Sequence, residues 1–179
     1  MSVIANIEAL VVARLTTALT ITGQAHPKVD VERWPDNPDR YKMMHPRGAV
    51  LVMYQGAKFD ETATARQLIE FDARFEIGLL SKTLRAPVVG IDANEPDTGV
   101  YTLLDQCRAA FLGWQPEGAA NTVRLVAESY EGYREGVWQY SLLVAIPMLT
   151  VVDREPVPGP FDVSGAGAFQ DVTGHYLEP

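Results

Sequence analysis

The sequence predicts an α+β fold, with a mostly antiparallel sheet of about five strands and two helices packed on it. Residues 68–81 alternate between apolar and polar side chains, which is typical of a long strand with one buried face. Apolar residues recur every three or four positions in 3–19 and in 100–112, which is typical of amphipathic helices. Two further apolar-rich segments flank Gly132 and Gly136, as in an antiparallel hairpin.

The first half of the chain is expected to contain one helix and three strands. Ser2 can cap a helix that runs to about Leu19 and ends before Gly23 and Pro27. Its expected buried stripe is Ile4, Ile7, Val11, Leu15 and Ala18. A short strand over 28–34 and a proline-punctuated loop over 35–47 should follow. Residues 48–54 are apolar on both faces, as in a strand covered on each side, and the polar residues 55–66 are expected to form a connection to the long strand.

The second half is expected to add one helix and two strands. After a loop over 82–97, Asp97 or Thr98 can cap a helix that runs to about Leu112, and Gly113 can stop it. Its expected buried stripe is Val100, Leu104, Cys107 and Phe111. Residues 122–130 and 136–152 should form the hairpin, in which Pro147 indicates an edge strand or a bulge.

Residues 1–152 are expected to form a single domain, and residues 153–179 a Pro/Gly-rich arm or tail. Two interpretations of this segment stay open. It can be a frayed terminus, or an arm that becomes ordered on a neighbouring subunit with Phe161, Phe169 and Tyr176 as anchors.

Composition excludes several classes of protein. The net charge of −8 and the pI of about 4.8 argue against a dedicated nucleic-acid-binding surface. The single cysteine excludes a disulfide framework and favours a reducing cytosol. We expect no secretory signal and no membrane insertion, because the apolar run over 142–149 is far shorter than the ~20 residues that span a bilayer.

No pattern in the sequence predicts a catalytic, cofactor-binding or metal-binding residue. No two of His26, His45 and His175 have metal-ligand spacing, and Cys107 is expected to be a small core residue. Residues 164–168 (SGAGA) resemble only part of a dinucleotide fingerprint and follow no strand. The carboxylates of the long strand are expected to form either a solvated face or an ionic contact with another subunit.

An ordered set of short segments resembles the tail terminator family of Mu-like phages and prophages. The set comprises residues 33–38 (RWPDNP), Tyr41, 45–46 (HP), 48–52 (GAVLV), 101–105 (YTLLD) and 136–140 (GVWQY). Together with the expected order of helices and strands, the resemblance covers roughly residues 3–150.

The resemblance implies a structural virion protein without catalytic residues. Such proteins form a ring, usually hexameric, that caps the head-proximal end of the tail tube, stops its polymerisation and offers an attachment surface for the head or neck. Expected partners are other copies of the chain, the tail tube protein, the tail sheath and neck or head-completion proteins. The expected location is the tail–neck junction of the virion, assembled in the bacterial host cytoplasm.

Two surfaces are hypothesised to serve such a ring. The row of Glu70, Asp72, Arg74 and Glu76 would line the channel, where its carboxylates repel DNA that passes through without specific binding; six copies would carry 6 × −8 = −48 charges. A cluster of Trp34, Tyr41, Met43 and Met44 would form a subunit interface, unless Trp34 and Tyr41 simply cover the local core.

Three alternatives remain at this point. The chain can be another neck component, such as a head–tail connector or a tail completion protein. It can be a small hydrolase that uses His45 and Asp39, or a binding module that stays monomeric.

Overall fold

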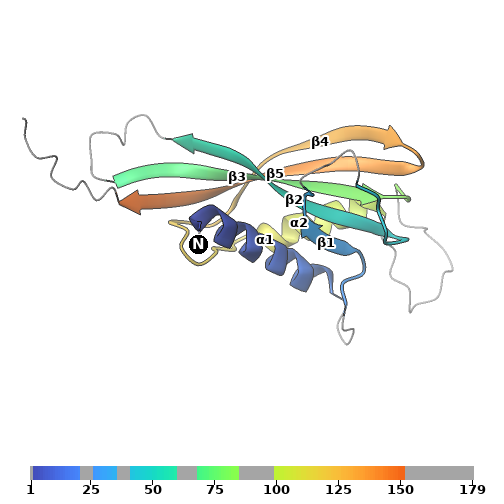
Figure 1. Ribbon diagram of the computed structural model, residues 1–179, viewed down its shortest axis with the longest axis horizontal. Coiled ribbons are helices and arrows are strands. Elements are labelled where there is room, and N and C mark those ends of the chain that lie inside the picture. The colour runs from blue at the N-terminus through green and yellow to red at the C-terminus, as the bar shows by residue number, and fades with distance from the viewer. Residues whose placement is uncertain (1, 21–25, 36–40, 60–67, 85–98, 152–179) are drawn as a thin grey trace, which may run out of the picture.

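The computed structural model describes residues 2–20, 26–35, 41–59, 68–84 and 99–151, and it confirms the predicted α+β fold. The helices are α1 (Val3–Leu19) and α2 (Val100–Phe111). The strands are β1 (Asp30–Arg33), β2 (Gly48–Phe59), β3 (Leu68–Ser81), β4 (Arg124–Arg134) and β5 (Val137–Val151), in the sheet order β1-β2-β3-β5-β4. Only β1 and β2 pair in parallel. Both helices lie on one face of the twisted sheet (Figure 1).

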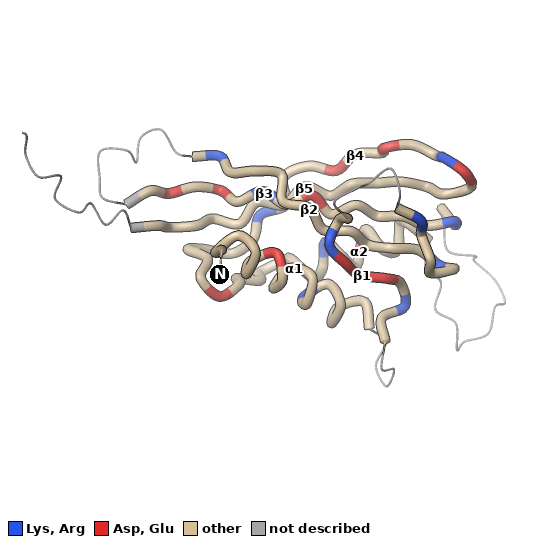
Figure 2. The backbone as a smooth tube through the Cα atoms, viewed as in Figure 1, with Lys and Arg blue, Asp and Glu red and all other residues tan. Residues whose placement is uncertain are grey.

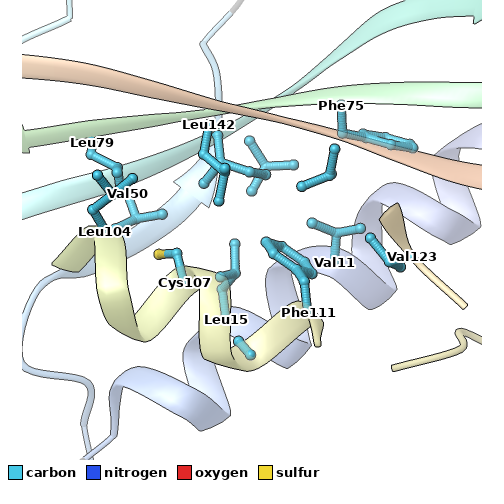
Figure 3. Packing of buried hydrophobic residues seen from close by; sticks show 14 of the residues in the cluster. Val11, Leu15, Val50, Phe75, Leu79, Leu104, Cys107, Phe111, Val123 and Leu142 are labelled. Carbon is cyan, nitrogen blue, oxygen red and sulfur yellow. The ribbon is translucent and has the colours of Figure 1, made fainter. Parts of the chain in front are cut away.

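The core lies between the two helices and this face of the sheet (Figure 3). The alternating pattern of the long strand is confirmed, because Phe75, Ile77 and Leu79 of β3 are fully buried. The predicted stripe of α2 is buried in full, and α1 buries Ile7, Val11, Leu15 and Leu19. The helices also contact each other through Arg14, whose Nε donates to the carbonyl oxygen of Ala110 at 2.9 Å.

Several local expectations at the helix ends are wrong. Ala18 is exposed, and the larger Leu19, four positions after Leu15, faces the core instead. The N-cap of α2 is Gly99, not Asp97 or Thr98, which lie outside the described residues. Ser2 does occupy the N-cap of α1, but its hydroxyl makes no capping hydrogen bond.

Strand β2 is longer than expected, because it continues through residues 55–59 as a partner of β3. A register shift between Tyr54 and Gly56 inserts Gln55 as an extra residue and lets the ladder continue to Phe59 opposite Phe71. The polarity of this segment reflects its position near the open end of the sheet, where side chains remain exposed.

The hairpin is confirmed, but Pro147 lies neither in an edge strand nor at a bulge. Strand β5 lies between β3 and β4, and Pro147 is in regular register with Asp72 of β3. On the other side of β5, the ladder with β4 begins at Arg124 opposite Ala145 and does not reach Pro147. There the carbonyl oxygen of Pro147 accepts a hydrogen bond from the N–H of Ala120 at 2.8 Å. The N–H that proline lacks is therefore not needed by a regular ladder.

Candidate protein–protein interface

The predicted charged row of β3 lies on the sheet face opposite the helices, which we call the outer face. Glu70, Asp72, Arg74 and Glu76 alternate with residues whose side chains point towards the helices, so all four share this face. Because β3 is the central strand of the sheet, the row runs along the middle of the outer face. Glu70 is exposed and the other three side chains are half-buried.

Opposite charges partly neutralise this row. Arg124 of β4 forms an ion pair with Asp72 across β5, with 2.5 Å between Nη2 and Oδ1. Lys58 of β2 lies directly opposite Asp72 on the other flank. Figure 2 shows Lys and Arg interspersed with Asp and Glu along the strands. The outer face is therefore a mixed-charge surface, with Glu70 as its freely exposed carboxylate.

A trough of about 390 Å³ crosses the outer face between β2 and β4. Two carboxylates lie in it: Glu76 accepts a hydrogen bond from Gln55 Nε2, and Glu131 accepts one from the Ser141 hydroxyl at 2.6 Å. Burial and then the negative charge of Glu131 raise the pKa of Glu76, and the hydrogen bond from Gln55 opposes this shift. The Nε of Arg74, also in the trough, is buried without a hydrogen-bond partner among the described residues. The trough thus combines two carboxylates and one guanidinium on the outer face, which suits contact with a polar partner.

The predicted interface cluster separates into covering and exposed residues. The Trp34 ring lies on the outer face directly over Gly78, where a Cβ atom would overlap it. Tyr41 is half-buried, and burial, followed by the nearby carboxylate of Glu32, raises the pKa of its phenol. Met43 is also half-buried, whereas Met44 is 85% exposed. Trp34 and Tyr41 thus cover part of the sheet, and Met44 is the member available to a partner.

Sequence reasoning missed an aromatic cluster on the β4–β5 hairpin. Tyr130 and Tyr133 are each 54% exposed, and their ring centroids lie 5.2 Å from Tyr140 and 4.7 Å from Trp138, respectively. Tyr101 of α2 joins the cluster, 5.8 Å from Tyr140. Exposed aromatic side chains of this kind are enriched at protein interfaces. Aligning the two halves of the expected hairpin around Gly136 would have brought these aromatic residues together.

The predicted chemical candidates do not assemble a reactive site in the described part of the chain. Burial raises the pKa of the Cys107 thiol to about 12, despite the opposing charge of Lys28, so the thiolate needed for nucleophilic attack does not form at neutral pH. His45 Nδ1 accepts a hydrogen bond from the backbone N–H of Arg47 at 3.2 Å, and its suggested partner Asp39 lies outside the described residues. No three His, Cys, Asp or Glu among the described residues are grouped so that they could hold a metal ion. Neither described helix is long and apolar enough to cross a membrane.

Comparison with known proteins gives one family. The model of the Gp37 protein family matches residues 11–163, which include both helices and all five strands apart from the first turns of α1. No curated protein matches the chain. The match extends over most of the sequence, and the chain therefore belongs to the Gp37 protein family, a phage-related family.

Proposed function

We propose that this protein is a phage tail terminator, which forms a ring on the head-proximal end of the tail tube. The observation that carries the proposal is membership of a phage-related family across residues 11–163, a range that contains most of the segments resembling tail terminators of Mu-like phages. The ring would stop polymerisation of the tube and offer a surface for attachment of the head or neck.

The described surface supports a role in assembly. The outer face of the sheet carries a trough lined by charged side chains, and the hairpin carries exposed tyrosines. Large exposed apolar side chains together with mixed charges are typical of surfaces that bind other proteins. We propose that this protein works by binding other copies of itself and the tail tube protein, with sheath and neck proteins as further partners, at the tail–neck junction. No enzymatic activity is proposed.

The proposed ring assigns a task to the row on β3. If the outer face lines the channel, its carboxylates repel the phosphates of passing DNA, while Arg74 and Arg124 moderate the total charge. Glu70→Lys tests this idea cleanly, because Glu70 is exposed and has no ion pair in the described structure. We expect intact rings and slower DNA delivery into host cells. Unchanged delivery would contradict the channel assignment.

Light scattering after gel filtration, followed by electron microscopy of particles, tests the function itself. We expect a ring-sized oligomer, alone or after mixing with the tail tube protein, and antibody label at the head-proximal end of tails. Tails assembled without this protein should be longer and heterogeneous in length. Tails of normal length that fail to join heads would instead favour the alternative, a head–tail connector or a tail completion protein.

A further inference from the structure

Strand β4 leaves one long edge of the sheet open. Among the described segments it pairs only with β5, and ten of its eleven residues are exposed, with Gly132 half-buried. An exposed edge strand presents unpaired backbone N–H and C=O groups, to which another strand can add. The apolar side chains of Val126, Tyr130 and Tyr133 lie along this edge and are 46–54% exposed.

Strand β2 provides a second open edge on the opposite side of the sheet. The ladder from β1 reaches only Val52, and the N–H of Trp34 donates to the carbonyl oxygen of Val52 at 2.8 Å. No other described segment forms a backbone hydrogen bond with that edge of β2 between residues 53 and 59. The two open edges lie on different strands, β2 and β4, so a contact between them is heterologous and can close into a ring.

The strand directions fit such a contact. Strand β2 is antiparallel to β3, β3 to β5, and β5 to β4, so β4 runs antiparallel to β2. Rotation about a ring axis gives the strands of every copy the same inclination to that axis, so neighbouring copies keep these directions. The β4 edge of one copy then meets the β2 edge of the next copy in the antiparallel orientation.

Side-chain chemistry selects a register. Lys58 is exposed, lies on the outer face opposite Asp72, and forms no ion pair in the described structure. On the β4 edge, Glu131 is the acidic residue of the outer face. Its carboxylate accepts a hydrogen bond from the Ser141 hydroxyl, and Ser141 belongs to the outer face because it lies opposite Gly78. Placing Lys58 beside Glu131 pairs opposite charges and supplies a cation to the trough that holds two carboxylates.

The same register brings an aromatic pair together on the helix side and agrees with the lengths of the strands, whereas Gly56 and Ala57, which lack large side chains, fall beside Tyr133 and Gly132, which belong to the opposite faces. Phe59, which lies opposite Phe71, falls beside Tyr130, which lies opposite Tyr140, and both rings are on the helix side of the sheet. Arg134 falls beside Gln55, so the hairpin turn at 135–136 stops just short of Val52, the last residue of β2 that pairs with β1. About five residues of each strand overlap, which is close to the usual strand length of ~5–6 residues.

We propose that residues 55–59 of one copy pair antiparallel with residues 130–134 of the next copy, with Lys58 beside Glu131 and Phe59 beside Tyr130. This contact rests on the proposed ring and joins the sheets of neighbouring copies. Within one copy, Phe59 is level with Phe71 of β3, and Tyr130 is level with Leu79, eight residues further along the same strand. Placing Phe59 beside Tyr130 of the next copy therefore displaces each copy along the strands by about eight residues, or ~26 Å, relative to the previous copy. Such a stagger tilts the strands steeply against the ring axis, as in closed sheets.

Cysteine cross-linking between copies tests the pairing. Lys58→Cys and Glu131→Cys are prepared as separate proteins and mixed, and a short bismaleimide is added; the buried Cys107 should not react. We expect a covalent dimer only in the mixture, and a ladder up to the full ring from the chain that carries both changes. Lys58→Cys mixed with Glu117→Cys, at an exposed position after α2, is the matched control and should not cross-link.

A charge swap gives a second readout that needs no cross-linker. Lys58→Glu should raise the protein concentration at half-assembly by about tenfold or more, since like charges repel across a contact, and adding Glu131→Lys should restore assembly. Rings of unchanged mass without cross-links in the mixture would overturn the pairing and leave the proposed function standing. Dimers of Glu131→Cys alone would show symmetric β4–β4 pairing instead. A wild-type protein that stays monomeric at every concentration, also with tube protein, would remove the ring and this contact together.

Discussion

The contact between Trp34 and Gly78 gives a quantitative test of how the outer face is covered. Gly78 lies in the central strand β3, and a Cβ atom added there would overlap Cζ3 of the Trp34 ring and approach its Cη2 at 3.2 Å. Gly78→Ala should therefore push the ring off the sheet. Overpacking of this kind costs about 1–3 kcal/mol, and for a chain of 179 residues each kcal/mol lowers Tm by about 2–4 °C.

The sign of this effect should reverse when the ring is absent. In a Trp34→Ala background nothing blocks the new methyl group, and replacing glycine by alanine inside a strand stabilises by about 0.5–1 kcal/mol. The two backgrounds should thus differ by about 1.5–4 kcal/mol, which is the coupling energy of a double-mutant cycle.

Urea unfolding followed by far-ultraviolet circular dichroism measures all four proteins of the cycle. This signal is preferable to tryptophan fluorescence, because Trp114 and Trp138 also emit. An unchanged m-value would show that the midpoint shift reports stability. An equal effect of Gly78→Ala in both backgrounds would refute the placement of Trp34 on the sheet.

Three further predictions follow from the described side chains. Folding raises the pKa of Glu76, so its ionised form lowers stability above that pKa. Glu76→Gln should therefore raise the free energy of unfolding at pH 7, and the gain should vanish below about pH 4, as measured by urea unfolding at both pH values. The Cys107 thiol should stay unreactive towards Ellman's reagent in the folded protein and react fully in urea, because it is buried. Met44→Ala should leave Tm within about 2 °C while it weakens assembly, whereas Tyr41→Ala should lower both, as measured by calorimetry and light scattering.

Most of the fold could be predicted because hydrophobic periodicity is strong where an element covers the core. The bounds of β3 and α1 agree with the expected residues 68–81 and 3–19, since each has one continuous buried face. The second half of β2 has no such pattern, because its side chains extend past the helices and stay partly exposed. This part of β2 stays in the sheet because it pairs with β3, and a pairing between two strands cannot be read from the residues of one strand alone.

The candidate interface was harder to predict for the same reason. Alternation placed Glu70 and its neighbours on one face, but it could not show that Arg124, 52 positions away, would pair with Asp72. Nor could it show that Trp34 would cover Gly78, because that contact depends on the path of the chain across the sheet. Residues on one element share a face by periodicity, whereas contacts between elements depend on tertiary structure.

The strand order also has a consequence for biosynthesis. Strand β5 is the last of the described strands to be made, yet it lies between β3 and β4, so β3 keeps one side unpaired until the polypeptide has been synthesised past residue 137. Until then a nascent chain exposes one edge of β3, and β4 has no partner among the described strands. Pairings across such sequence distances form slowly and leave open strands prone to aggregation, so chaperones in the host are expected to bind this chain before its final strand is inserted.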